Sequence, residues 1–217
     1  MYRALLFDLD GTLAETDSLH LPTWVDTLAP YGVQVDEELY RDRISGRNTA
    51  EIVRELLPDL ADEEGRSIGD AKEASFRERA SGLEPLPGLI DFIKRRKERG
   101  MRIALVTNAP EENVKAILLA LELGDSFDTI VLADEVEAVK PDPAPYRAAL
   151  KETAVPAEEA LAFEDSVSGI SSSVAAGIPT VGIASSQDPE RLLRAGAFTT
   201  AEDFTDPQLL ALIDPQA

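Results

Sequence analysis

Two aspartates stand one residue apart directly after an apolar segment near the start of the chain. The segment reads Leu5-Leu6-Phe7-Asp8-Leu9-Asp10-Gly11-Thr12-Leu13. Alternate residues of a strand point to the same face, so the side chains of Asp8 and Asp10 are expected to crowd together while the strand continues. Two such carboxylates repel each other, which costs stability unless a cation or a proton lies between them. Gly11 allows a sharp turn after the pair. The segment therefore predicts a buried strand that ends in a chemically active site.

The composition is that of a folded chain with one core and a small accessory domain. The chain has 217 residues, of which 44% are hydrophobic and 29% are charged, which argues against wholesale disorder. It has no cysteine, so disulfides and thiolate metal sites are excluded. No apolar run has the length of a membrane span, and the first strand begins too early to leave room for a signal peptide. We therefore expect a cytoplasmic protein that does not associate with membranes.

The chain is strongly acidic, with 21 basic and 41 acidic residues and a formal net charge of −20. Such a field repels nucleic acid, and we expect no nucleic-acid partner. It also repels a phosphorylated molecule at long range, so an anion site must be built locally from a metal, a basic side chain and backbone N–H groups. The acidity itself is typical of a well-solvated surface. For assembly, we expect a monomer or a weak homodimer.

Short β-branched or apolar runs alternate with segments of helical periodicity over most of the chain. This alternation predicts an α/β fold, with a parallel sheet covered by helices on both faces. The predicted strands are residues 4–8, 102–107, 129–132, 160–164 and 180–183. The helices predicted between the later strands are residues 89–99, 111–121, 145–153 and 167–176.

Residues 15–81 break this alternation, because they contain no convincing strand. They show the pattern of several amphipathic helices, over residues 19–28, 37–43, 49–57 and 67–79. We predict a small helical cap domain over residues 15–81, inserted into a core formed by residues 1–14 and 82–217. The exit of the insert, residues 81–88, is rich in glycine and proline, which is typical of a hinge.

Polar residues lie at or just beyond the carboxyl ends of several predicted strands. In an open parallel sheet, ligands bind beyond the carboxyl ends of the strands, so these residues should converge at one edge. They comprise four carboxylates, a hydroxyl, an amide and a lysine, namely Asp8, Asp10, Thr107, Asn108, Lys140, Glu164 and Asp165. We expect the helical insert to lie over this edge as a lid.

An oxygen-rich cluster of this kind suits a hard divalent cation such as Mg²⁺. We predict that Asp8, Glu164 and Asp165 bind the metal, with the backbone carbonyl of Asp10 as a further ligand. The alternative for Glu164 and Asp165 is that they cap the next helix, since acidic residues favour helix N-termini. Beside the pair formed by Asp8 and Asp10, the metal site is the stronger interpretation.

A carboxylate that faces Mg²⁺ and a phosphoryl group can attack phosphorus and form an aspartyl-phosphate. Asp8 is predicted to be this nucleophile, and Asp10 to be the acid and base that protonates the leaving oxygen and then activates water. Thr107 and the N–H groups near Asn108 would hold phosphate oxygens. Lys140, which two nearby prolines distinguish from an ordinary surface lysine, would neutralise charge on the nucleophile and the phosphate.

Four segments of the chain, in order, resemble the four motifs of the haloacid dehalogenase superfamily. They are Asp8-Leu9-Asp10-Gly11-Thr12-Leu13, Val106-Thr107-Asn108, Lys140-Pro141 and Phe163-Glu164-Asp165-Ser166. The resemblance covers essentially the whole chain and implies a Rossmann-like core, Mg²⁺ dependence and the residue roles given above. The helical insert resembles the small cap of the subfamily that contains β-phosphoglucomutase and many sugar-phosphate phosphatases.

The resemblance also argues against two activities. The dehalogenases of the superfamily lack the second aspartate of the first motif, so Asp10 favours phosphoryl chemistry. Phosphonate-cleaving relatives use a cap lysine to form a Schiff base. The only lysine of this insert is Lys72, which lies late in it and away from the expected place.

Phosphatase and mutase activity both remain open within this subfamily. His20, the only histidine, is followed by Trp24 and stands where the mutase branch has a histidine near the substrate. Thr107-Asn108 looks more like the phosphatases, and residues 45–49 depart from the mutase pattern. Arg47 is a candidate clamp for a distal anionic group of the substrate. His20 and Arg47 could instead be an ordinary helix residue and an ordinary surface residue.

We therefore predict a Mg²⁺-dependent phosphomonoesterase that hydrolyses a small phosphorylated metabolite, with a sugar phosphate as the favoured class. One alternative is a β-phosphoglucomutase-like isomerase. Another is a catalytically silent member that binds a metabolite or a protein, although the complete set of catalytic side chains argues against it.

Overall fold

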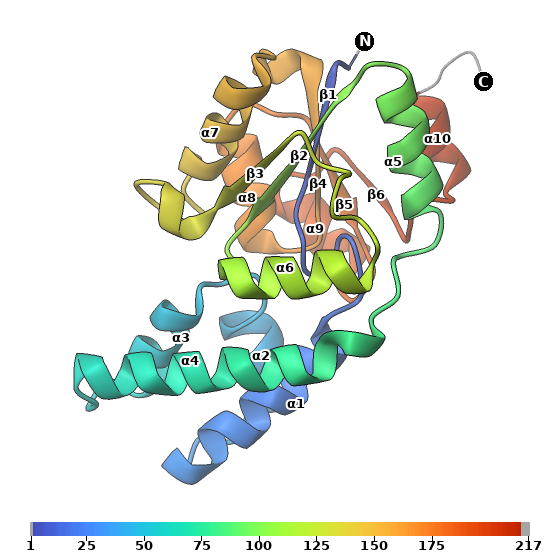
Figure 1. Cartoon of the computed structure of the whole chain (residues 1–217). Helices are drawn as coiled ribbons and strands as arrows, with labels where there is room; N and C mark the ends of the chain where they lie inside the picture. The colour runs from blue at the N-terminus through green and yellow to red at the C-terminus, as the bar shows by residue number, and fades with distance from the viewer. Residues whose placement is uncertain (1, 214–217) are drawn as a thin grey trace.

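The structure is a computed structural model, and it describes residues 2–213. Its centre is a parallel sheet of six strands in the order β3-β2-β1-β4-β5-β6 (Figure 1). The strands are β1 (Ala4–Phe7), β2 (Arg102–Thr107), β3 (Thr129–Leu132), β4 (Ala160–Glu164), β5 (Thr180–Ile183) and β6 (Thr199–Ala201). The predicted α/β fold with a parallel sheet is confirmed.

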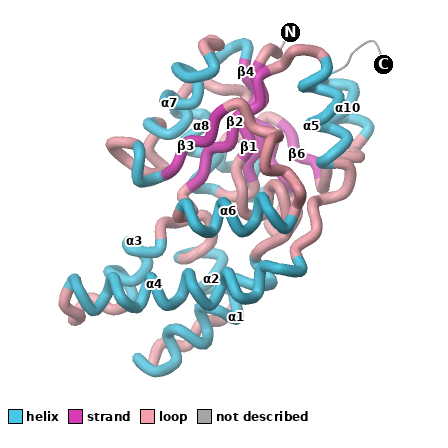
Figure 2. Tube along the Cα trace, in the orientation of Figure 1, coloured by secondary structure: helices cyan, strands magenta, loops and turns pink. Residues whose placement is uncertain are grey.

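The central strand β1 is buried on both faces, because helices cover both sides of the sheet (Figure 2). Leu5 and Phe7 belong to a hydrophobic cluster that includes residues of α5 (Leu89–Glu98) and α6 (Glu111–Ala120). Ala4 and Leu6 point the other way, into a cluster with α7 (Ala144–Thr153). The alternation of strand side chains thus fills two cores from one short segment. The remaining core helices are α8 (Val167–Ala175), α9 (Pro189–Ala195) and α10 (Pro207–Ile213).

Three short elements were missed by the sequence prediction, namely β6, α9 and α10. β6 has three residues, and α9 and α10 have seven each, so none of them is long enough to show a clear period. The first strand ends at Phe7, one residue before the predicted end at Asp8. The bounds of β2, β3, β4 and β5 agree with the prediction.

Four helices lie together below the sheet in Figure 1, between β1 and α5 in the chain. These cap helices are α1 (Asp17–Leu28), α2 (Glu37–Arg43), α3 (Thr49–Leu56) and α4 (Asp62–Arg79). They enclose a hydrophobic cluster of their own, which is built around Trp24, Leu28, Tyr40, Ile52 and Val53. Helix α4 begins earlier than predicted, with three acidic residues in its first turn, where negative charge stabilises the helix dipole.

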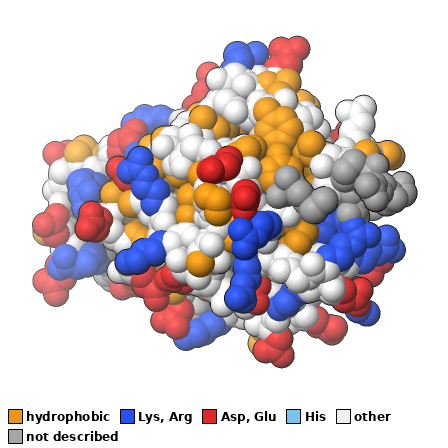
Figure 3. All heavy atoms as spheres, turned by 90° about the horizontal axis from the view of Figure 1, so that it is seen from above, with side chains coloured by type: hydrophobic (Ala, Val, Ile, Leu, Met, Phe, Trp, Pro, Cys, Tyr) orange, Lys and Arg blue, Asp and Glu red, His pale blue; other side chains and the backbone are white. Residues whose placement is uncertain are grey.

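The face of the molecule opposite the cap helices carries charged side chains of both signs around a partly apolar middle (Figure 3). The net charge of −20 is therefore not displayed on this face as one continuous acidic surface. Among residues 2–213, no helix has the length and apolar character needed to cross a bilayer.

Candidate active site

The register of the sheet brings the predicted site residues to one edge. Phe7 is paired with Leu105 of β2 on one side and with Phe163 of β4 on the other. Asp8 and Glu164 come one position after Phe7 and Phe163, and Thr107 comes two positions after Leu105. The Asp8 N–H continues the ladder by donating to the Phe163 carbonyl at 3.0 Å. Asp8, Thr107 and Glu164 therefore lie at the carboxyl ends of neighbouring strands, as the sequence pattern predicts for a ligand site.

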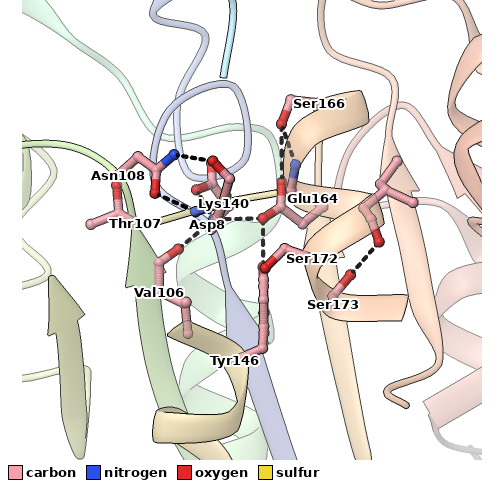
Figure 4. Close-up of polar contacts among 12 residues, drawn as sticks. Asp8, Val106, Thr107, Asn108, Lys140, Tyr146, Glu164, Ser166, Ser172 and Ser173 are labelled. Carbon is pink, nitrogen blue, oxygen red and sulfur yellow. Dashed lines mark hydrogen bonds and ion pairs between the residues drawn. The ribbon is translucent and has the colours of Figure 1, made fainter. Parts of the chain in front are cut away.

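Lys140 lies at the centre of this edge and is only 2% exposed. Its Nζ is 2.6 Å from Asp8 Oδ1, 2.6 Å from Glu164 Oε1 and 2.7 Å from the Val106 carbonyl oxygen (Figure 4). An ammonium group has three N–H donors, and these contacts use all three. Lys140 thus lies between two buried carboxylates and neutralises part of their charge. To contact a phosphate oxygen, its ammonium group would have to break one of these three hydrogen bonds.

Asn108 fixes the loop that carries Lys140. Its side-chain amide donates to the Lys140 carbonyl at 3.2 Å, and its Oδ1 accepts from the Lys140 N–H at 3.1 Å. The peptide bond that follows, from Lys140 to Pro141, is cis. The side chain of Asn108 is hydrogen-bonded to this loop. The predicted contact with a substrate near Asn108 would therefore be made by backbone N–H groups.

Three buried carboxylates form a cluster whose oxygens could share a metal ion. One oxygen from each of Asp8, Glu164 and Asp165 lies within 4.8 Å of the others. Burial raises the pKa of Asp8 to about 8 against the opposing charge of Lys140, and the neighbouring Glu164 and Asp10 carboxylates raise it further. Burial and the charge of Asp8 also raise the pKa of Asp165 well above its usual value. The cluster has more negative charge than Lys140 balances, and its all-oxygen donor set fits Mg²⁺.

Gly11 makes room for this cluster. Its φ is +71°, and a Cβ atom at this position would lie 2.1 Å from Asp165 Oδ2. The predicted sharp turn is therefore present, and it also lets the backbone pass directly against a carboxylate of the site.

Asp10 has a different environment from Asp8. The strand ends at Phe7 and so does not carry the two side chains, although both line the same cavity and the charge of Asp10 still raises the pKa of Asp8. Asp10 Oδ1 lies 3.1 Å from His20 Nε2 and is outside the cluster formed by Asp8, Glu164 and Asp165. Although burial acts to raise it, the hydrogen bond from His20 and the nearby cationic groups hold the pKa of Asp10 below its usual value.

His20 is oriented by Lys72, which the sequence analysis placed away from the position expected of a Schiff-base lysine. Lys72 Nζ lies 3.1 Å from His20 Nδ1 and 5.0 Å from the centre of the Trp24 ring. An ammonium group can only donate, so Nδ1 accepts and Nε2 carries the proton that is donated to Asp10. The imidazole is stacked on Phe76, with ring centroids 4.0 Å apart.

Glu73 of α4 connects these polar contacts to helix α6, which packs against the sheet. It accepts hydrogen bonds from Lys72 at 3.0 Å, from Thr49 and from Asn113 at 2.6 Å. Asn113 lies on α6 and accepts in turn from Arg77 at 2.9 Å. The sequence reasoning missed Glu73 and Asn113, since neither lies at a strand end or in a recognisable motif.

A cavity of about 70 Å³ lies between the cap helices and the edge of the sheet. Nearly all the predicted site residues line it, and Glu164 lies just beneath. The predicted residues on its wall are Asp8, Asp10, His20, Arg47, Thr107, Asn108, Lys140 and Asp165. Thr107 is 1% exposed, and its hydroxyl accepts from the Ala109 N–H at 2.9 Å, which leaves its proton available to a ligand.

Arg47 lines the same cavity but is already bound to other groups. Its Nη1 lies 2.6 Å from Glu55 Oε2 and 2.9 Å from the Arg43 carbonyl oxygen. The hydrogen bonds that Glu55 accepts from the side chains of Arg47 and Arg43 lower its pKa. A substrate anion at Arg47 would have to compete with Glu55.

Comparisons with known proteins identify the family of this chain. The family described as haloacid dehalogenase-like hydrolase matches residues 5–183. The chain belongs to the haloacid dehalogenase-like hydrolases. Within this family it is 37% identical to protein CbbY of Cereibacter sphaeroides, over 94% of this chain and 89% of that protein. It is 31% identical to a phosphoglycolate phosphatase of Rhodospirillum rubrum, over 94% and 88% of the two chains.

A crystal structure of CbbY from Rhodobacter sphaeroides in complex with xylulose-1,5-bisphosphate matches with a TM-score of 0.83 and 32% identity. The match covers 95% of this chain and 96% of that one. This haloacid dehalogenase-like hydrolase is therefore an enzyme of the phosphatase type, acting on phosphoric monoesters.

Proposed function

We propose that the chain is a Mg²⁺-dependent phosphomonoesterase that hydrolyses a small phosphorylated metabolite, with a sugar phosphate as the favoured class. The observation that carries this proposal is the contact between Lys140 and Asp8, 2.6 Å long, beside the buried acidic cluster. A lysine that orients one carboxylate oxygen, next to a site for a divalent cation, prepares that carboxylate to attack phosphorus.

In the first half of the reaction, an oxygen of Asp8 attacks phosphorus and the bond to the leaving oxygen breaks. Asp10 supplies the proton that the leaving oxygen needs. Asp8, Glu164 and Asp165 would hold Mg²⁺, which when bound supplies positive charge to the phosphoryl oxygens. Thr107 would donate its free hydroxyl proton to one of those oxygens.

In the second half, Asp10 takes a proton from water, and the water oxygen attacks phosphorus to release Asp8 and inorganic phosphate. The lowered pKa of Asp10 favours the base form that this half requires. The first half requires Asp10 to hold a proton, and the negative charge of a bound phosphate favours protonation of a nearby carboxyl group.

The charges around the cavity favour hydrolysis over isomerisation. An isomerase that interconverts sugar 1- and 6-phosphates must accept a phosphate at either end of the sugar. Apart from Lys140, the basic side chains on the cavity wall are His20, Arg47 and Lys72. Lys72 is paired with Glu73 at 3.0 Å and Arg47 with Glu55 at 2.6 Å, so a second phosphate would have to displace a carboxylate.

Phosphate release from a panel of sugar phosphates, phosphoglycolate and xylulose 1,5-bisphosphate, with Mg²⁺ or with EDTA, tests this proposal. We expect Mg²⁺-dependent release that Asp8→Asn reduces by at least about a thousandfold, while Asp59→Asn, an exposed control, retains full activity. Product analysis on the same samples separates the alternatives. Isomerised sugar phosphate without free phosphate would establish a mutase, and no turnover of any panel member would favour a silent protein.

A further inference from the structure

Tyr146 lies on α7 directly beneath the acidic edge and is fully buried. Its hydroxyl donates to Glu164 Oε1 at 2.5 Å, and Figure 4 shows the side chain directed at this carboxylate. The same oxygen accepts from Lys140 Nζ at 2.6 Å. Lys140 Nζ also lies 5.2 Å from the centre of the Tyr146 ring. No motif includes Tyr146, and the reaction steps above do not use it.

The two carboxylate oxygens of Glu164 differ in the hydrogen bonds that they accept. Oε1 accepts from Tyr146 and Lys140, whereas within residues 2–213 Oε2 accepts one hydrogen bond, from Ser166 Oγ at the long distance of 3.5 Å. A carboxylate with one oxygen held by two short hydrogen bonds cannot rotate without breaking both of them. Oε2 is therefore the oxygen with lone pairs available for a cation.

Helix α8 restricts the other side of the same carboxylate. A Cβ atom at Gly169 would lie 1.9 Å from Glu164 Oε2. The position accepts glycine only, because the carboxylate occupies the space where a larger side chain would begin. Glu164 is thus confined between the Tyr146 hydroxyl on α7 and the backbone of α8.

We propose that Tyr146 is a positioning residue of the metal site: its hydroxyl fixes Glu164 Oε1 so that Oε2 faces the divalent cation. This inference rests on the proposed function, because the cation itself belongs to that proposal. Outer groups that orient a ligand in this way commonly change metal affinity by about 10-fold to 100-fold when they are removed.

Tyr146→Phe tests the inference, because it removes only the hydroxyl and keeps the buried ring beneath Lys140. Mg²⁺ binding to the purified chain is measured by calorimetry, and kcat and KM are measured at saturating Mg²⁺. We expect the Kd for Mg²⁺ to rise by about tenfold or more, while KM for the phosphate substrate stays within about twofold. Tyr31→Phe, on an exposed tyrosine, should match the wild type in every measurement.

Gly169→Ala provides a second variant that acts on the same carboxylate from the other side. It should weaken Mg²⁺ binding as well, whereas Gly124→Ala, which has open space around it, should not. Thermal unfolding in EDTA identifies any variant that loses affinity only because it is unfolded.

The possible failures are distinguishable. If the wild type binds Mg²⁺ and Tyr146→Phe gives the same titration curve, Tyr146 only fills the core and the inference is overturned. If the wild type does not bind Mg²⁺ at all, the proposed function fails instead. A rise in KM at saturating Mg²⁺ with an unchanged metal Kd would place Tyr146 in substrate binding and also contradict the inference.

Discussion

His20 Nε2 lies 3.1 Å from Asp10 Oδ1, so the only histidine of the chain connects cap helix α1 to the aspartate that follows β1. On its other side, Nδ1 faces Lys72 of α4, also at 3.1 Å. The orientation and the charge of Asp10 therefore depend on residues of the cap helices, although Asp10 itself is next to the sheet.

Replacing His20 should slow turnover and change its pH dependence. We expect His20→Ala to lower kcat by about 100-fold, within the usual range for general acid–base groups. Because His20 lowers the pKa of Asp10, its removal should move the acid limb of the kcat profile to higher pH. His20→Gln, whose amide can donate near the Nε2 position, should retain more activity than the alanine variant. An unchanged acid limb in His20→Ala would show that Asp10 is not the group that titrates there.

Removing the buried cation should destabilise the metal-free protein. Lys140→Met leaves Asp8 and Glu164 close together without the cation that they share, and loss of one member of a buried ion pair costs about 3–5 kcal/mol. We expect this loss of unfolding free energy in urea denaturation with EDTA, and a smaller loss with Mg²⁺, which binds the folded state. The control is Lys115→Met, because Lys115 forms an exposed pair with Glu111 and should change stability little. Equal losses in the two variants would contradict the central role of Lys140.

The stability of the metal-free protein should fall as the pH rises. The pKa of Asp8 is raised to about 8 in the folded chain, above its ordinary value near 4. Between these values the folded state binds more protons than the unfolded state, so the unfolding free energy decreases with increasing pH. Urea midpoints measured in EDTA from pH 5 to pH 8 should therefore decline, and saturating Mg²⁺ should flatten the decline. Asp8→Asn should show a shallower slope, with the remainder due to Asp165, whose pKa is also raised.

The contact between α4 and α6 should support substrate affinity. Asn113 is 1% exposed, donates to Glu73 at 2.6 Å and accepts from Arg77 at 2.9 Å. Asn113→Ala removes both bonds and should lower kcat/KM by about tenfold, since a net hydrogen bond to a charged group contributes about 1.5–3 kcal/mol. Steady-state kinetics at saturating Mg²⁺ measure this effect. An effect on the metal Kd alone would point to the acidic cluster and not to the cap.

The elements and residues that could be predicted from the sequence are those identified by a short stretch of consecutive residues. Mainly apolar runs of five or six residues predicted the central strands, and the polar residues at their ends, Asp8, Thr107, Glu164 and Asp165, were the candidates for the site. A parallel sheet brings such ends together by its topology, without help from the details of packing.

The residues that were missed depend on contacts between distant parts of the chain. Tyr146 is 18 positions from Glu164, and Lys72 is 52 positions from His20. Each lies on a helix where an aromatic or a basic side chain has an ordinary explanation in the core or on the surface. Only the packing of α4 against α1, and of α7 beneath the sheet, gives these side chains their partners.

The distance along the chain between Asp8 and Lys140, 132 positions, has a consequence for synthesis on the ribosome. Asp8, the proposed nucleophile, is made long before β4 and Glu164 at its end. Because β1 pairs with both β2 and β4, the central strand cannot complete its pairing until then. A nascent chain that stops short of β4 therefore carries the proposed nucleophile without Glu164 and Asp165, so the proposed metal site can form only after these two residues have been made.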